Sequence, residues 1–122
     1  VPQNTMPPIT AVINPLLNGP GDGLPAAATG QRYLLTESTG SNSNTGNPAL
    51  WLGEFGQPLV AQANDIVEYN GQRWRVAFAS SSETTVEYVT NLTTGLQYEW
   101  TGAEWIKSYQ GIYVGGTWSL VL

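Results

Sequence analysis

The sequence predicts an all-β fold, in which an antiparallel meander of hairpins forms a small barrel or sandwich behind an extended, proline-rich N-terminal arm. Three observations predict it. The 122 residues include 14 Gly and 8 Pro but only 11% charged residues, which is a turn-rich, neutral-polar composition. After residue 30, short runs of β-branched and aromatic residues alternate with period two. No segment has the apolar spacing of an amphipathic helix.

Residues 1–28 are predicted to form the arm, and residues 29–122 the β domain. Six of the eight prolines precede Gly30, and prolines at this density exclude helix interiors and central strands. The arm also holds large apolar residues and a single charge, Asp22. We therefore expect it to lie on protein, either on its own domain or on another chain. The residues predicted to bind a partner are Met6, Ile9, Val12, Ile13, Leu16 and Leu17.

The strands are predicted in order after the arm. Gln31–Thr36 is the first, and the polar residues 38–48 form a long exposed loop. Around Trp74, period-two alternation places Trp74, Val76 and Phe78 on one face. Six further segments have strand length: Asp65–Tyr69, Arg73–Ala79, Thr84–Asn91, Leu96–Trp100, Glu104–Tyr109 and Thr117–Leu122.

One internal repeat organises the second half of the chain. An aromatic residue, a Gly two positions later and a Trp five positions later recur three times. Glycine supplies the positive φ of a tight turn, and Asn-Gly is typical of a two-residue hairpin turn. We expect turns at Asn70-Gly71 and Thr101-Gly102, with the flanking aromatics meeting across the strands. The three copies are 69–74, 100–105 and 113–118.

The composition excludes several classes of function. The chain has no His and no Cys, which removes the usual zinc ligands and nucleophile pairs. Its net charge is −5, and Arg73 with Arg75 is the one pair of clustered cations, so we expect no nucleic-acid binding. No stretch is apolar enough to span a membrane. Glu99 and Glu104 flank one turn, but a small β domain offers no deep cleft for them. We expect no enzyme, no cofactor and no metal.

Several short motifs occur along the chain. They are Leu24-Pro25, Gly30, Arg32-Tyr33-Leu34-Leu35, Asp65–Gly71 with Trp74, Val89–Gly95, Trp100-Thr101-Gly102 with Glu104-Trp105, and Gly111-Ile112-Tyr113 with Trp118-Ser119-Leu120. Together these motifs resemble accessory β domains in virion structural proteins of tailed bacteriophages, the contractile-tailed type in particular. The resemblance implies a non-enzymatic structural role: subunit interaction, decoration or stabilisation of the particle. It also implies a location in the virion, other virion subunits as partners, and a homo-oligomer or lattice.

A second resemblance gives the alternative. Residues 65–74 look like the core strand pair of small chitin- and cellulose-binding modules, in which surface aromatics stack on sugar rings. Trp51, Trp100 and Trp105 are the candidates for stacking on a surface carbohydrate. A small β domain poor in Leu and Ile also needs aromatics inside, so a core position stays open for these three. Trp74 and Trp118 are expected in the core.

Overall fold

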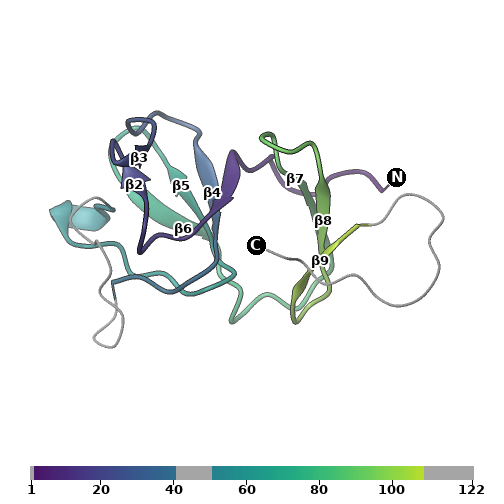
Figure 1. The fold of residues 1–122 in the computed structure, drawn as a ribbon. Coiled ribbons are helices and arrows are strands. Elements are labelled where there is room, and N and C mark those ends of the chain that lie inside the picture. Colours follow the sequence, from purple (N-terminus) through teal and green to yellow (C-terminus); the bar gives the residue numbers. More distant parts are fainter. Residues whose placement is uncertain (1, 41–50, 109–122) are drawn as a thin grey trace.

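The computed structural model describes residues 2–40 and 51–108 of the chain. Within them the fold is all-β, with nine strands in three sheets and no α-helix. None of the described helical segments is long and apolar enough to cross a membrane. Figure 1 shows two lobes, one built from β1 to β6 and one from β7 to β9. The strands are β1 (Ala11–Ile13), β2 (Gly19–Pro20), β3 (Gly23–Leu24), β4 (Arg32–Leu35), β5 (Ile66–Tyr69), β6 (Trp74–Phe78), β7 (Glu87–Thr90), β8 (Gln97–Trp100) and β9 (Trp105–Lys107).

The larger sheet has the order β1-β4-β5-β6. β1 runs parallel to β4, while β4, β5 and β6 are antiparallel neighbours. All four residues of β4 are buried, because side chains alternate between two covered faces. Leu34 belongs to one core cluster, whereas Tyr33 and Leu35 belong to another on the opposite face.

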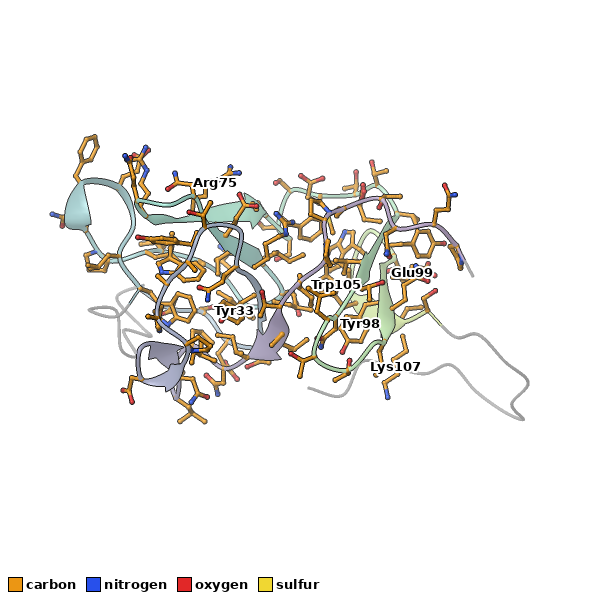
Figure 2. The ribbon with its side chains drawn as sticks, turned by 90° about the horizontal axis from the view of Figure 1, so that it is seen from above. Tyr33, Arg75, Tyr98, Glu99, Trp105 and Lys107 are labelled. Carbon is orange, nitrogen blue, oxygen red and sulfur yellow. The ribbon has the colours of Figure 1, made fainter. Side chains whose placement is uncertain are left out.

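The smaller sheet is an antiparallel meander with the order β7-β8-β9. It packs on the larger sheet, and Figure 2 shows Tyr98 and Trp105 among the side chains of this lobe. The indole N–H of Trp105 donates to the backbone oxygen of Asn64 at 2.9 Å, which ties the two lobes together. None of the three described sheets closes into a barrel, and the core cluster shared by the larger and the smaller sheet fits the other predicted form, a small sandwich. The core cluster between the sheets consists of Ile9, Leu34, Ile66, Phe78, Val89, Tyr98, Trp100 and Trp105.

A second core cluster covers the other face of the larger sheet. Three aromatic rings lie at its centre: Trp51 is 5.9 Å from Tyr33 and 4.8 Å from Trp74 between ring centroids. Trp51 lies just before a loop that returns to the sheet at Leu59, whose N–H donates to the Trp51 oxygen at 2.7 Å. This cluster consists of Ile13, Tyr33, Leu35, Trp51, Leu59, Ala61, Val67 and Trp74.

A β-bulge corrects one sequence expectation. Ile66 pairs with Phe78, but Val67 pairs with Val76, so Ala77 is the extra residue in β6. A bulge of this kind reverses which face the following side chain occupies. Trp74 and Val76 therefore pack in the cluster around Trp51, whereas Phe78 packs between the sheets. The predicted single face for these three residues is wrong for Phe78.

The segment predicted as an arm is part of this fold. The amide of Ile9 donates to the oxygen of Thr90, and the amide of Thr5 donates to the oxygen of Tyr88, both at 2.9 Å. Ile9 also forms a parallel bridge with Asn91, after which β1 pairs with β4 in the other sheet. Residues 5–13 thus cover the β7 edge of one sheet and the β4 edge of the other, and such cover keeps strand edges from pairing with other chains.

Both described copies of the aromatic repeat form hairpins. Tyr69 pairs with Trp74 across the β5–β6 turn, and Trp100 pairs with Trp105 across the β8–β9 turn. Gly71 and Gly102 have φ values of 102° and 101°, a region of backbone conformation that strongly favours glycine. The third copy, residues 113–118, and the strand predicted over 117–122 lie outside the described residues, as does most of the predicted loop 38–48.

Candidate functional site

The β5–β6 turn positions the first wall of the candidate site. The amide of Asn70 donates to the oxygen of Arg73 at 3.1 Å, so the turn is centred on Gly71 and Gln72, one residue later than predicted. The Asn70 Oδ1 accepts from the amides of Gln72 and Arg73 at 2.9 and 3.0 Å. This side-chain cap leaves Gln72 exposed at the tip and holds the Tyr69 ring 5.2 Å from the Trp74 ring.

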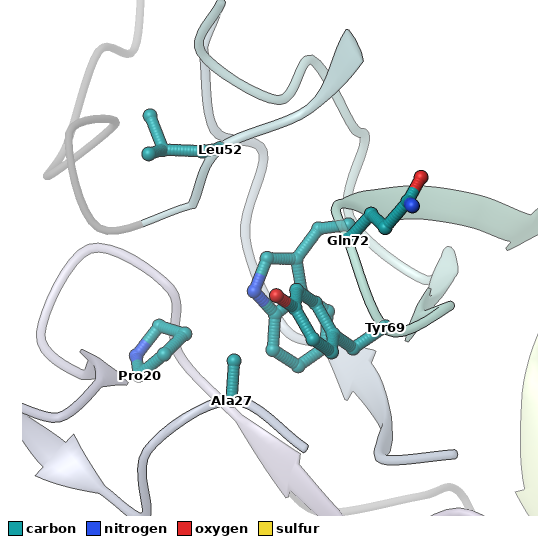
Figure 3. Close-up of a pocket in the computed structure, with 6 residues that line it drawn as sticks. Pro20, Ala27, Leu52, Tyr69 and Gln72 are labelled. Carbon is teal, nitrogen blue, oxygen red and sulfur yellow. The ribbon is translucent and has the colours of Figure 1, made fainter. Parts of the chain in front are cut away.

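A partly open hollow of about 140 Å³ lies beside this hairpin. Figure 3 shows Tyr69, Gln72, Leu52, Ala27 and Pro20 around it. The lining mixes apolar and aromatic side chains with polar groups, among them the Gln72 amide and the Tyr69 hydroxyl. Trp74 completes the lining. The hollow is smaller than the pockets of about 300–1,000 Å³ that hold drug-sized ligands, so it accommodates a single ring or side chain.

A tight loop forms the second part of the site. Leu52 and Pro58 make an antiparallel bridge, and the amide of Gly53 donates to the oxygen of Gln57 at 2.7 Å. The amide of Trp74 donates to the Leu52 oxygen at 2.9 Å, which fastens the loop to the edge of β6. The loop therefore stands next to the hollow, with Leu52 shared by both.

Phe55 occupies the tip of this loop, in the short 3₁₀ turn η1 (Glu54–Gly56). Its side chain is 87% exposed, and its backbone is left-handed with φ 56° and ψ 27°. A bulky residue in that conformation is strained by about 1–2 kcal/mol. In Figure 1 the η1 turn lies at the outer end of the β1–β6 lobe, away from β7–β9. Phe55 was not among the residues predicted to be functional, although a Phe between Gly53 and Gly56 has no regular strand in which to be buried.

Two of the arginines on the larger sheet form ion pairs with one carboxylate. Glu68 accepts from Arg32 at 2.8 Å and from Arg75 at 2.6 Å, and Figure 2 shows Arg75 on the outer surface. Burial alone raises the pKa of the Glu68 carboxyl, but the hydrogen bonds and charges of the two arginines outweigh it and lower that pKa below its ordinary value. Burial raises the pKa of the Tyr33 hydroxyl. Among the described residues, the Arg73 side chain has no ion pair.

The six residues predicted to bind a partner fall into two groups. Ile9 and Ile13 are buried in the chain's own two core clusters, and Met6 and Val12 pack against the first. Ile9 and Ile13 are therefore not free to dock on another protein, which corrects the expectation for these two. Met6 and Val12 keep part of their surface exposed and stay predicted contacts. Leu16 is half-buried, and only Leu17, at 74% exposed, is free of the core.

The three indoles predicted to stack on sugar are all interior. Trp51, Trp100 and Trp105 are 0%, 1% and 4% exposed, and each indole N–H donates to a backbone oxygen at 2.9–3.2 Å. No face of these rings is available to a sugar, so the stacking prediction is wrong at these positions. The open alternative, that a core short of aliphatic residues is filled with aromatics, accounts for them.

The described carboxylates form no metal centre: residues 2–40 and 51–108 hold no group of three or more acidic residues close enough for an ion. Asp65 is buried but serves the fold, since its Oδ1 accepts from the amide and hydroxyl of Ser80 at 2.8 and 2.7 Å. Residues 91–93 have the sequence Asn-Leu-Thr of an N-glycosylation site, but Asn91 is buried and donates to the Tyr98 hydroxyl at 3.2 Å. It is therefore inaccessible to glycosylation.

Comparison with models of protein families, with curated proteins and with solved structures gives no match for this chain.

Proposed function

We propose that the chain is a non-enzymatic structural protein, or a domain of one, that joins, decorates or stabilises a phage virion through contacts between protein subunits. The observation that carries the proposal is Phe55, a fully projecting aromatic side chain held in a strained backbone. Backbone strain of this kind is concentrated at functional positions, and aromatic residues dominate the binding energy of protein interfaces. The virion setting comes from the resemblance of the hairpin motifs.

The surface around Phe55 supports the interaction role. Leu52 and Val60, on the same loop, are 45% and 63% exposed, so this loop carries three exposed large apolar side chains. Only 11% of the chain is charged, less than half of the usual proportion. A subunit that buries several of its sides in an assembly needs less solubilising charge than a free monomer.

The second candidate function is a small carbohydrate-binding module, and one observation favours it. The hollow combines the Tyr69 ring with the Gln72 amide, and an aromatic ring beside a hydrogen-bonding group suits a single sugar ring. Such a module would bind its sugar with Tyr69 and Gln72 in place of the three buried tryptophans. A glycan array probed with the full chain tests it, and a Tyr69→Ala variant should lose any binding that is found.

The virion proposal is tested on particles from the source of the sequence. Particles are purified through a density gradient, and antibodies and quantitative mass spectrometry measure the copy number of the chain. We expect a fixed number of copies per particle, retained through salt washes. Absence of the chain from infectious, intact particles would overturn the proposal.

A further inference from the structure

We propose that the hollow beside the β5–β6 hairpin receives Phe55 of a second copy of this chain, so that two copies exchange their Phe55 rings about a twofold axis. The inference deepens the proposed function, because it names the partner of the interaction loop, and it rests on that function only in assigning the loop to protein contacts.

The size of the hollow fits one phenyl ring. Its volume is about 140 Å³, and an engineered apolar cavity of about 150 Å³ is known to bind benzene. The wall includes the partly exposed Tyr69 ring, which favours a further aromatic ring in an edge-to-face arrangement. Trp74, which is 2% exposed, contributes little open ring surface. Of the two Phe residues in the described part of the chain, Phe55 is exposed to solvent, whereas Phe78 is 3% exposed in the core.

The position of the loop allows a reciprocal exchange. Leu52 lines the hollow, and the loop closed by the Leu52–Pro58 bridge carries Phe55 at its tip, so one loop contributes to both the ring and the hollow. In a twofold interface the same patch serves both subunits, and each ring can enter the other copy's hollow. A ring and a hollow on opposite faces would instead produce an open chain of subunits.

The charges flanking the two features are complementary. The exposed Glu54 directly precedes Phe55, whereas Arg73 directly follows Gln72 of the hollow and makes no ion pair among the described residues. A twofold exchange brings the acidic neighbour of each ring towards the basic neighbour of each hollow. This opposite pairing matters because each copy has a net charge of −5 and the two otherwise repel.

Sedimentation equilibrium of the full chain, over a concentration series, tests the proposal. We expect a monomer–dimer equilibrium that Phe55→Ala weakens at least about tenfold, as for a residue central to an interface. Gln72→Trp, which covers the hollow from an exposed position, should weaken it similarly. Leu17→Ala removes an exposed apolar side chain elsewhere and should leave it unchanged. Thermal melting checks that each variant is folded.

A mixing experiment adds a direct readout of reciprocity. The Phe55→Ala chain lacks the ring but has an open hollow, and the Gln72→Trp chain has the ring but a covered hollow. Mixed together, they should form a heterodimer with one ring seated, at an affinity between the parent and either variant alone. Failure of the mixture to associate more strongly than either variant would overturn the twofold exchange.

Two further outcomes would overturn the inference. One is a chain that stays monomeric at every concentration, or a dimer indifferent to Phe55→Ala. The other is a monosaccharide that shifts the NMR signals of Tyr69 and Gln72 while the chain remains monomeric. A monomeric chain that is nevertheless found in particles would contradict this inference and leave the virion proposal standing. A Phe55-dependent dimer that is absent from particles would contradict only the virion proposal.

Discussion

Trp100 and Trp105 meet across the β8–β9 turn with their ring centroids 5.3 Å apart. The Thr101 Oγ1 accepts from the amides of Ala103 and Glu104 at 3.3 and 3.1 Å, just as the Asn70 side chain caps the β5–β6 turn. One structural unit is thus used twice. In β8–β9 its aromatic pair fills the core between the sheets, and in β5–β6 its aromatic pair lines the surface hollow.

Gly102→Ala should destabilise the chain by more than about 2 kcal/mol. Position 102 has a φ of 101°, and a Cβ there would lie 2.6 Å from the backbone oxygen of Thr84, which cannot move aside as a side chain can. Gly95→Ala is the matched control, because Gly95 also has a positive φ but open space around it, and should cost about 1 kcal/mol. Urea unfolding measures both, and equal losses would rule out the backbone clash.

Ile9→Ala should lower the free energy of unfolding by about 2–5 kcal/mol, the usual cost of truncating a buried aliphatic side chain. Ile9 is fully buried between the two sheets although it lies near the N-terminus. Leu17→Ala, in the same segment but 74% exposed, should change stability by less than about 0.5 kcal/mol. If the two variants melt alike in dilute solution, the segment does not pack as described.

Phe55→Asn should stabilise the isolated chain by about 1 kcal/mol, because Asn tolerates the left-handed conformation that Phe resists. The melting temperature should rise by a few degrees while self-association is lost. Such opposed effects are expected where a strained residue is retained for binding. A fall in the melting temperature would mean that the Phe55 ring packs on its own chain.

Glu68→Gln should cost about 1.5–3 kcal/mol at pH 7, because it leaves the buried Arg32 without its anionic partner. The arginines lower the folded-state pKa of Glu68. The stability that ionised Glu68 adds to the fold is therefore fully present above the pKa of a free Glu carboxyl, near 4.3. It is lost as the pH falls through the lower pKa that Glu68 has in the folded chain. The melting temperature, followed from pH 7 to pH 2, should show a smaller acid loss in Glu68→Gln than in the parent.

The matched control for that measurement is Glu104→Gln, at an exposed turn position. It should melt as the parent does at pH 7 and show the same acid loss. An acid profile of Glu68→Gln that superimposes on those of the parent and the control would mean that the Arg32–Glu68–Arg75 contacts do not couple folding to pH.

The hairpins were predictable because their causes are local. A glycine that supplies positive φ and aromatics at a fixed spacing define the turns at Gly71 and Gly102 wherever the hairpin packs. The bulge at Ala77 was not predictable, since it arises from fitting β6 against β5 while sending Phe78 to the core between the sheets. Alternation alone carries no information on such an extra residue.

The proline density of the N-terminal segment left open which surface the segment covers. Residues 9–13 contain no proline, and β1 sits at the edge of its sheet, where flanking prolines such as Pro8 do no harm. The amides of Ile9 and Thr10 donate to the oxygens of Thr90 and Arg32, which are distant in sequence, so no local pattern indicates these contacts. The exposure of Phe55 likewise depends on how the loop after Trp51 is fastened to β6, which is a tertiary contact.

The central claim is that the N-terminal segment belongs to the chain's own fold and that the Phe55 loop makes the contact between chains. Amide hydrogen exchange, compared between dilute and associated full-length chain, tests it most directly. The amide of Ile9 should be as protected in the dilute chain as those of β7 and β8, and association should add protection only around residues 52–60 and 69–74. Free exchange of residues 5–13 in the dilute chain, with protection gained there on association and none at the loop, would contradict it.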